Sequence, residues 1–389
     1  MNKYKYPLGN APINNNDIDM LVEWLKTYPR LTMGPLTQEV EKDWANYVGT
    51  ERSIFLNSGS SANLMMVYLG IISGKLKKGD KVIVPACGWA TTIAPVMQFG
   101  LEPIMIDANK YNFGMDIEKI NEICTNEDVK GMIYVHVLGV PNDKDEIKSI
   151  KDNFDLFLME DCCASVGAKY SDGTKIGTLG DVSSFSFYFG HQLSTIEGGF
   201  VNTDNEEYYQ TMLMLRSHGW TKDVSEEKYN EISDKWNIDK INGPFNFITT
   251  GFNLRATDLQ AFLGIEQIKK ADEVMQLRNR NHERYVQNMQ DKFVFQKWND
   301  SWPVSLHIGI LAQDSNHRKS VLEKCEANGI ETRDWSHGNL GRHPFWKDHY
   351  GAFENVFADQ IYERGFILPT YPELSLEDID FISNICNDV

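Results

Sequence analysis

The sequence lacks any long apolar stretch. Its N-terminus, MNKYKYPLGNAPINNND, has no apolar run of signal-peptide length, and no later segment reaches the roughly 18 consecutive apolar residues of a membrane-spanning helix. Cysteine is also scarce, and the cysteines are scattered without a pairing pattern, at Cys87, Cys124, Cys162, Cys163, Cys325 and Cys386. These absences predict a cytoplasmic protein in a reducing compartment, with no membrane partner.

Basic residues are in the minority. The chain has 38 Lys and Arg against 55 Asp and Glu, which gives a formal net charge of −17. This balance argues against a nucleic-acid-binding surface and favours a soluble protein. An anionic ligand would require the few basic groups to be concentrated locally.

Strand and helix patterns alternate through the first half of the chain. Apolar strand patterns at residues 53–56, 81–85, 103–107, 132–137 and 155–161 are separated by helical or loop segments. Such alternation predicts an α/β fold with a mostly parallel sheet. A helical pattern with charges of both signs starts near residue 265. We therefore predict a large domain over residues 1–264 and a small domain over residues 265–389.

The most informative stretch is SSFSFYFGHQLSTIEGGF at residues 183–200. Small or polar side chains alternate with aromatic ones over residues 184–189, which predicts a strand, and Gly190 ends it. His191 follows at once, and a second strand pattern restarts at Phe200. The stretch predicts two short strands that present a tight loop with one imidazole, a side chain that titrates close to neutrality.

The segment NSGSSAN follows the first strand pattern and precedes an apolar helical run. A strand, a small-residue loop and a helix beginning near Ser60 would aim backbone N–H groups and a helix dipole at a phosphate. Ser60 and Ser61 would add hydroxyl donors. A plain structural Gly/Ser turn is the alternative.

Asp161 closes the apolar strand pattern DLFLMED. Ligands bind at the carboxyl ends of the strands in open parallel sheets, so Asp161 is a candidate site residue, with helix capping as the alternative. Trp89 falls where a loop meets a helix, and it is either a core residue or a ring that stacks on a planar ligand. His136 also ends a strand pattern, and we interpret it as a structural histidine.

The spacing around His191 carries a resemblance to a known family. Ser186, four residues, a titratable base, five residues and then Glu-Gly-Gly form a pattern that resembles the fold-type-I pyridoxal phosphate (PLP) enzymes that modify nucleotide-linked keto sugars. The resemblance implies an aspartate-aminotransferase-like α/β fold, in which a mostly parallel sheet flanked by helices forms the large domain and a smaller C-terminal domain is α+β. The aminotransferases of that family carry a lysine at the base position, which forms a Schiff base with the cofactor. The histidine at this position resembles the subgroup of sugar 3-dehydratases.

The resemblance implies roles for individual residues. The implied catalytic residues are His191 and Asp161, whose carboxylate would keep the pyridine nitrogen protonated and make the ring an electron sink. The implied cofactor-binding residues are Ser60, Ser61, Trp89, Asp161, Ser186 and Asn253. The candidate substrate-binding residues are Thr32, Met33, His218, Lys222, Arg255 and Glu331. A turn between surface helices (for Thr32 and Met33), a structural turn (for Asn253) and a solvated loop (for Glu331) stay open as alternatives. We expect no metal site and no iron–sulfur cluster, because closely spaced cysteines do not follow His191.

The implied activity is a 3-dehydration that depends on PLP and on its amine form, pyridoxamine phosphate (PMP). The substrate would be a GDP-linked 4-keto-6-deoxy sugar, of the mannose type or a heptose homologue, and the products a 3,6-dideoxy-4-keto sugar and ammonia. L-glutamate would regenerate PMP, and a homodimer would share the active site across its interface. Such sugars enter surface polysaccharides. The sequence does not separate a GDP from a CDP carrier.

Two other functions stay open. A nucleotide-sugar aminotransferase would need a lysine at this loop, and the nearby candidates, Lys169 and Lys175, lie upstream of the strand. A non-catalytic binding protein with the PLP-enzyme fold is the second alternative, because the Schiff-base lysine is missing.

Overall fold

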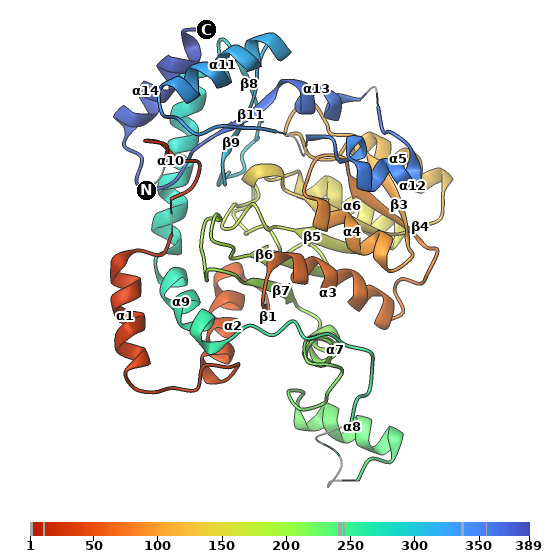
Figure 1. Cartoon of the computed structure of the whole chain (residues 1–389). Helices are drawn as coiled ribbons and strands as arrows, with labels where there is room; N and C mark the ends of the chain where they lie inside the picture. Colours follow the sequence, from red (N-terminus) through yellow and green to blue (C-terminus); the bar gives the residue numbers. More distant parts are fainter. Residues whose placement is uncertain (1–2, 11, 240–242, 244–245, 336–337, 355) are drawn as a thin grey trace.

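Two β-sheets, one large and one small, organise the fold (Figure 1). The computed structural model describes residues 3–10, 12–239, 243, 246–335, 338–354 and 356–389. Among these residues, the large sheet contains, in spatial order, β1 (Arg52–Leu56), β7 (Gly199–Thr203), β6 (Val182–Ser186), β5 (Phe157–Asp161), β4 (Val129–Val135), β2 (Lys81–Pro85) and β3 (Glu102–Ile106). The small sheet contains β10 (Arg333–Asp334), β11 (Gly365–Leu368), β9 (Ile308–Leu311) and β8 (Val294–Phe295).

The large sheet is mostly parallel, as the sequence predicts. Strands β6, β5, β4, β2 and β3 pair in parallel, whereas β7 runs antiparallel to both β1 and β6. The carboxyl ends of parallel strands meet at one edge of a sheet. Asp161, the last residue of β5, and Ser186, the last residue of β6, are therefore brought to the same edge.

Helices flank both sheets in the described part of the chain. They are α1 (Asn15–Leu25), α2 (Pro35–Val48), α3 (Gly59–Ile72), α4 (Ala90–Gln98), α5 (Ile117–Asn126), α6 (Lys144–Phe154), α7 (Glu206–Arg216), α8 (Glu226–Trp236), α9 (Asp258–Lys269), α10 (Ala271–Met289), α11 (Ser315–Ala327), α12 (Pro344–Tyr350), α13 (Phe357–Arg364) and α14 (Leu376–Asn387). Two short 3₁₀ segments, η1 (Val137–Gly139) and η4 (Leu340–Arg342), complete the elements that bear on the site.

The large sheet is covered on both faces. Met159 of β5 belongs to the core that includes Met65 of α3 and Ile93 of α4. Leu158, the residue before it, packs instead in the core that includes Ile120 of α5. Successive strand residues point to opposite faces of a sheet, so these two neighbours serve different layers. Asp161 is two residues after Met159, which places it on the α3 and α4 face.

The small sheet packs on the long helix α10 and on α11 and α14 (Figure 1). Tyr285 of α10 and Ile382 of α14 share one buried core with Ile310 of β9. The N-terminal segment joins this core through Tyr6, which is 5% exposed. The division into residues 1–264 and 265–389 stays a prediction.

The strand predicted over residues 184–189 is shorter in the structure. Strand β6 ends at Ser186, and Tyr188 and Phe189 are each 48% exposed. The backbone turns here, because the His191 N–H donates to the Tyr188 carbonyl oxygen at 2.9 Å. This turn replaces the ladder with β7, so the predicted strand end at Phe189 was wrong.

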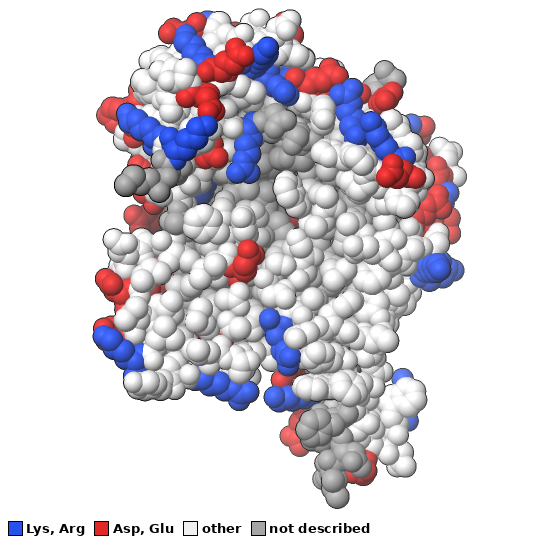
Figure 2. Space-filling view, in the orientation of Figure 1, with Lys and Arg blue, Asp and Glu red and all other residues white. Residues whose placement is uncertain are grey.

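The surface drawn in Figure 2 carries basic and acidic side chains that are interspersed along its upper part and edges, and much of its middle is uncharged. This face therefore presents no continuous basic surface. Among the described residues, no helix combines the length and the apolar character that crossing a bilayer requires.

Candidate active site

His191 lies in the loop that connects β6 to β7. Its ring packs edge-on against Tyr188, with the ring centroids 5.8 Å apart, and its Nδ1 atom is 3.4 Å from the Ser186 carbonyl oxygen. The side chain is half-buried. The loop that the sequence predicts therefore presents the imidazole beside the carboxyl end of β6.

The surroundings of His191 favour its neutral form. Burial lowers the pKa of His191 to about 4, and the nearby positive charge of Arg278 acts in the same direction. The Ser186 carbonyl and the Asp161 carboxylate oppose this shift, and their effects are smaller than that of burial. At neutral pH the imidazole is unprotonated and can accept a proton.

Asp161 is 5% exposed and is held by residues from both flanking helices. Its Oδ2 atom accepts hydrogen bonds from Asn63 Nδ2 of α3 at 2.8 Å and from Thr92 Oγ1 of α4 at 2.6 Å. Its Oδ1 atom accepts the Cys163 N–H at 3.0 Å. Ser184 of β6 donates to Asn63 Oδ1 at 2.6 Å and so orients the amide. The network fixes the carboxylate at the edge of the sheet.

Sequence reasoning missed three of these positioning residues. Asn63, Thr92 and Ser184 are all buried, and their partners lie far away in the sequence. The signal that could have found two of them is polarity: Asn63 and Thr92 are buried polar residues in the largely apolar helices α3 and α4. Ser184 gives no such signal, because β6 contains three serines.

The N-terminus of α3 is the segment that the sequence predicts to bind a phosphate, and we call it the candidate phosphate loop. Its phosphate-binding role stays a prediction. Ser58 caps the helix by accepting the Ser61 N–H at 3.1 Å, and Ser61 Oγ donates to Asn57 Oδ1 at 2.6 Å. Ser60 is exposed, and its hydroxyl donates to Thr91 of α4 at 3.1 Å. The first turn of α3 therefore offers backbone N–H groups, hydroxyls and the positive end of a helix dipole.

This candidate phosphate loop and Ser186 meet at very close range. A Cβ atom on Gly59 would lie 2.5 Å from Ser186 Cβ, which is too close for two carbon atoms. Glycine, which has no Cβ atom, therefore fits at this position. Ser186 itself is 5% exposed. The close approach of Gly59 to Ser186 brings the end of β6 next to the first turn of α3, which carries Ser60 and Ser61. We call these three serines the cradle, and their donor groups are of the kind that bind a phosphate.

Trp89 is the N-cap residue of α4 and is 62% exposed. It directly precedes the first turn of α4. In this turn Thr91 is hydrogen-bonded to Ser60, and Thr92 is hydrogen-bonded to Asp161. The backbone of Trp89 therefore lies at the same edge of the sheet as the cradle. A core position, the alternative from sequence, does not agree with this exposure. Its stacking role stays a prediction.

Asn253, Arg255 and His218 form one cluster. Arg255 Nε donates to Asn253 Oδ1 at 3.0 Å, and Arg255 Nη2 is 3.3 Å from His218 Nε2. The backbone of Arg255 pairs with Leu56 at the end of β1, directly before the candidate phosphate loop. His218 has a φ of 64°, in the left-handed region, and its N–H donates to the Phe252 carbonyl at 2.6 Å.

Met33 and Lys222 lie together. Both line a cavity of about 260 Å³ next to the buried ion pair of Glu41 and Arg216, whose atoms are 2.5 Å apart. Thr32 pairs with Thr257 in an isolated β-bridge. The structure thus places two of the six candidate substrate-binding residues on one cavity.

Glu331 makes a different set of contacts. Its Oε2 atom accepts the Leu8 N–H at 2.8 Å, and its Oε1 atom is 3.9 Å from Arg333. These contacts tie the N-terminal segment to the small sheet. Among the described residues, Glu331 makes no hydrogen bond or ion pair with the other predicted site residues. Its role in substrate binding stays a prediction.

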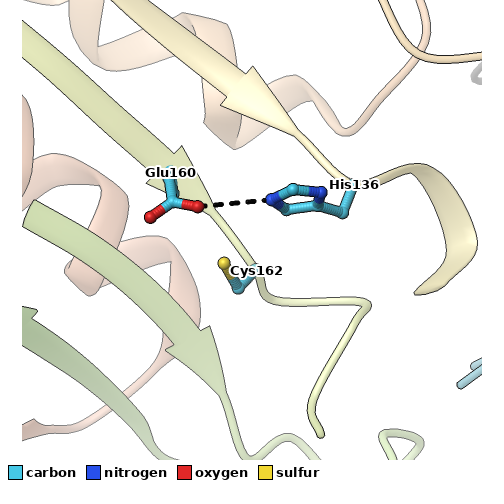
Figure 3. A group of neighbouring side chains, drawn as sticks. All are labelled: His136, Glu160 and Cys162. Atoms are coloured by element: carbon cyan, nitrogen blue, oxygen red, sulfur yellow. Dashed lines mark hydrogen bonds and ion pairs between the residues drawn. The ribbon is translucent and has the colours of Figure 1, made fainter. Parts of the chain in front are cut away.

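A second cluster of titratable groups lies on the other face of β5 (Figure 3). His136 Nε2 is 3.4 Å from Glu160 Oε1, and Cys162 lies beside them, with one ligand-type atom of each within 4.8 Å of the others. Burial raises the pKa of Glu160, but hydrogen bonds from His136, Tyr170 and Gly180 outweigh it and hold the pKa below its usual value. His136 is buried and hydrogen-bonded, as a structural histidine should be.

The chain is similar over most of its length to proteins named for reactions of GDP-linked sugars. A GDP-4-keto-6-deoxy-D-mannose 3-dehydratase of Yersinia pseudotuberculosis is 32% identical over 370 residues, which cover 93% of this chain and 91% of that protein. A GDP-perosamine synthase of Caulobacter vibrioides is 27% identical, with 95% of this chain and 94% of that protein covered.

Solved structures agree with the fold. An Escherichia coli GDP-4-keto-6-deoxy-D-mannose-3-dehydratase with bound hydrated PLP matches with a TM-score of 0.90 at 28% identity, covering 98% of this chain and 99% of that chain. A GDP-4-keto-6-deoxymannose-3-dehydratase with a trapped PLP-glutamate geminal diamine matches with a TM-score of 0.86 at 27% identity, covering 98% and 100%. The predicted α/β fold of the PLP enzymes is confirmed. Residues 12–387 match one family model, and the chain belongs to the DegT/DnrJ/EryC1/StrS aminotransferase family.

Proposed function

We propose that the protein is a PLP- and PMP-dependent 3-dehydratase of a GDP-linked 4-keto-6-deoxy sugar, of the mannose type or a heptose homologue. It would form a 3,6-dideoxy-4-keto sugar with release of ammonia, for surface-polysaccharide biosynthesis. The observation that carries the proposal is His191, which occupies the loop position where the aminotransferases of the family carry a lysine. Relatives named as 3-dehydratases support it.

The cradle residues would hold the cofactor without a covalent link. Ser60, Ser61 and Ser186 would bind its phosphate, with Asn253 supplied by the second subunit of a homodimer, and Trp89 would cover the ring. When bound, the cofactor's pyridinium ring takes up electrons from the reacting bond.

Asp161 would accept the pyridinium N–H. Its Oδ2 atom is already held by Asn63 and Thr92, so the carboxylate is fixed before any ligand binds. A prepositioned carboxylate needs little reorganisation, and it keeps the ring nitrogen protonated.

His191 would move the proton. An imidazole that is neutral at neutral pH can remove a proton beside the reacting carbon while the hydroxyl on sugar carbon 3 departs, and can return it later. It cannot form a stable covalent link to the cofactor, so nitrogen would leave as ammonia. L-glutamate would then regenerate PMP in a separate half-reaction.

An aminotransferase activity is the alternative, since GDP-perosamine synthases are also relatives. The nearby lysines do not support it. Lys169 Nζ lies over the Trp302 ring at 5.2 Å, and Lys175 Nζ lies over the Tyr47 ring at 4.3 Å. Both ammonium groups are engaged with aromatic rings rather than with the His191 loop. A non-catalytic binding protein is the other alternative. The hydrogen bonds from Asn63 and Thr92 that fix the Asp161 carboxylate favour a catalytic role over this alternative.

One experiment separates the three functions. The purified protein is supplied with PMP, L-glutamate and a 4-keto-6-deoxy nucleotide sugar, and products are identified by mass spectrometry together with an ammonia assay. We expect ammonia and a 3-deoxy sugar. Nitrogen retained on the sugar would mean an aminotransferase, and no reaction would mean a binding protein. A thermal-shift panel of GDP and CDP then identifies the carrier.

A further inference from the structure

Helix α2 begins without a local cap. Its N-cap residue is Gly34, which has no side chain to accept a hydrogen bond, and Pro35 follows at the first helical position. The first N–H groups of a helix have no partner inside the helix, so this helix start needs an acceptor from another part of the chain. The two residues just before it, Thr32 and Met33, are candidate substrate-binding residues.

Asp258, in the first turn of α9, supplies that acceptor. Its Oδ1 atom accepts the Gly34 N–H at 2.8 Å, the Thr37 N–H at 3.0 Å and the Thr37 hydroxyl at 2.7 Å, and its Oδ2 atom accepts the Leu36 N–H at 3.2 Å. The side chain is 3% exposed. A carboxylate at the N-terminus of a helix also interacts favourably with the helix dipole. Asp258 therefore caps α2 from 224 residues away.

The backbone of α9 holds the same segment at its other end. The Asp258 N–H donates to the Leu31 carbonyl oxygen at 3.1 Å, and Thr257 pairs with Thr32 in an isolated β-bridge. The segment thus wraps around Asp258, with contacts on both sides of Met33. Thr32 is exposed and Met33 is half-buried, and both lie between α1 and α2. Hydrogen bonds to α9, rather than a helix or strand of their own, therefore fix their backbone.

Asp258 shapes the candidate substrate side without facing it. Met33, Gly34 and Thr37 line the cavity of about 260 Å³ that Lys222 also borders, whereas the buried Asp258 is not among its lining residues. The carboxylate thus holds a wall of the cavity from behind.

A different residue of α9 contacts the loop that carries His191. Gln260 Nε2 donates to the Glu197 carbonyl oxygen at 2.5 Å, and Glu197 lies in the same β6–β7 loop as His191. Among the described residues, Asp258 makes no hydrogen bond or ion pair with that loop. A substitution at Asp258 therefore changes the support of the Thr32 and Met33 segment and leaves the direct support of the His191 loop in place.

We propose that Asp258 is a positioning residue for the nucleotide sugar, and that it holds Thr32 and Met33 where they contact the sugar. This inference rests on the proposed function, in which a GDP-linked 4-keto-6-deoxy sugar is the substrate. Asp258 itself contacts neither the sugar nor the cofactor. Its loss should therefore weaken sugar binding, while the affinity for PMP and the rate at saturating sugar stay close to those of the wild type.

Sugar binding is tested without turnover by titrating GDP-4-keto-6-deoxymannose into PLP-loaded protein in a calorimeter, since PLP has no amino group to condense with the keto group. We expect Asp258→Asn to weaken binding about tenfold, because an amide NH₂ would face donors that the carboxylate now accepts. Hydrogen exchange measured by mass spectrometry should become faster in the peptide of residues 30–38, which loses its anchor.

Asp107→Asn is the matched control. The N-cap residue of α13, Val356, also makes no side-chain cap, and Asp107 accepts the Phe357 N–H at 2.7 Å and the Ala358 N–H at 2.8 Å, the first from 250 residues away. Helix α13 carries none of the predicted site residues. This variant should lose a long-range helix cap of the same kind and still bind the sugar as the wild type does.

A milder variant keeps the test decisive if Asp258→Asn does not fold. Thr37→Val keeps the shape of a side chain that is 1% exposed, and it removes the hydroxyl that donates to Asp258 at 2.7 Å. It should weaken sugar binding about threefold and speed exchange in the same peptide. A sugar affinity equal to that of the wild type in Thr37→Val, and in Asp258→Asn if it folds, would overturn the inference. An equal loss of affinity in Asp107→Asn would overturn it as well.

The failure of this inference can be told apart from failure of the proposed function. Wild-type protein preloaded with PMP performs one round of dehydration if the proposed function holds. Dehydration by the wild type, together with a sugar affinity that does not depend on Asp258 or Thr37, would remove Asp258 from sugar recognition and leave the 3-dehydratase assignment in place. A sugar affinity that depends on both residues, without any dehydration, would do the reverse.

Discussion

Glu160 and Asp161 are adjacent on β5 but end in different environments. Glu160 accepts hydrogen bonds from the Tyr170 hydroxyl at 2.6 Å and from backbone N–H groups of Gly177, Leu179 and Gly180. These donors occupy about four lone-pair sites on the Glu160 carboxylate, which is about as many as a carboxylate has. Asp161 accepts three hydrogen bonds from the described residues, so its Oδ1 atom can take one more donor. The first acid serves the fold, and the second is the one for which we propose a ligand.

The two histidines beside these acids repeat the contrast. His136 is fully buried and lies within 3.4 Å of Glu160 and 3.3 Å of the Tyr170 hydroxyl. His191 is half-buried, and its ring nitrogen is 3.4 Å from one backbone carbonyl. A histidine held by several partners fixes structure, whereas one with a single long contact can exchange a proton with a substrate. Substitutions on each side of β5 should therefore separate stability from chemistry.

The largest effect is expected from His191→Asn. Removal of a general base slows its step by about 10² to 10⁴-fold, so single-turnover dehydration from PMP should fall within that range. The thermal midpoint and the affinity for PMP should stay close to those of the wild type. Rapid-quench kinetics with PMP-loaded protein measure the rate.

His136→Asn is the matched control for this substitution. It removes the contacts of a fully buried ring with Glu160 and Tyr170, so it should lower the thermal midpoint while each folded molecule still turns over. A His191→Asn protein with a normal dehydration rate would remove His191 from the role of base and end the contrast between the two histidines.

The next effect concerns stability and comes from Glu160→Gln. An amide NH₂ would face the donors that the carboxylate now accepts, and the free energy of unfolding should fall by about 2–4 kcal/mol. Urea denaturation measures the change. Glu122→Gln is the control, because Glu122 is in an exposed pair with Lys119 and its loss should cost under about 1 kcal/mol.

The same substitution has a pH signature. The folded-state pKa of Glu160 lies below the ordinary value of 4.5. Its contribution to stability is therefore complete above pH 4.5 and is lost as the pH falls from 4.5 toward the lowered pKa. The free energy of unfolding of Glu160→Gln should lack this part of the decrease that the wild type shows as the pH falls below 4.5. A variant as acid-sensitive as the wild type would show that other carboxylates dominate.

The sequence predicted the part of the site that depends on local pattern. Alternating side chains and glycines located the loop of His191, and the apolar run before Asp161 placed that acid at a strand end. The Gly/Ser segment before α3 was correctly interpreted as the N-terminus of a helix. These features depend on a few neighbouring residues, so periodicity and turn chemistry are sufficient to find them.

The sequence could not predict the contacts that bring distant residues together. Asn63 and Thr92 reach Asp161 across 98 and 69 residues, and only the packing of α3 and α4 on the sheet joins them. The end of β6 at Ser186 was also missed, because Tyr188 and Phe189 continue the alternating pattern while the hydrogen bond from the His191 N–H to the Tyr188 carbonyl turns the chain. The contacts of Glu331 with Leu8 depend in the same way on the N-terminal segment joining the small sheet.

A smaller effect is expected from Thr92→Val. The substitution keeps the shape of the side chain and removes its hydroxyl, which donates to Asp161 Oδ2 at 2.6 Å. Loss of a hydrogen bond to a charged acceptor costs about 1.5 kcal/mol, so the affinity for PMP and the dehydration rate should together fall about tenfold. Absorbance of the bound cofactor reports its ring protonation. Thr91→Val, which affects a hydroxyl that contacts Ser60 at 3.1 Å, is the control and should leave the spectrum unchanged.

The smallest effect is a change in the pH dependence of stability caused by His191→Asn. The folded-state pKa of His191 is lowered from 6.5 to about 4, so between these values the unfolded chain binds a proton that the folded chain does not. Stability therefore decreases as the pH falls through this window, by at most about 1.4 kcal/mol per pH unit, and less because the ring is partly exposed. His282, with its pKa lowered to about 3, contributes in the same direction in both proteins. Urea midpoints at pH 7 and pH 5 should differ less for His191→Asn than for the wild type or for Thr92→Val, which retains both histidines. Parallel losses in all three proteins would mean that the imidazole is solvated in the folded state, and the distinction between a prepared base and an ordinary surface histidine would disappear.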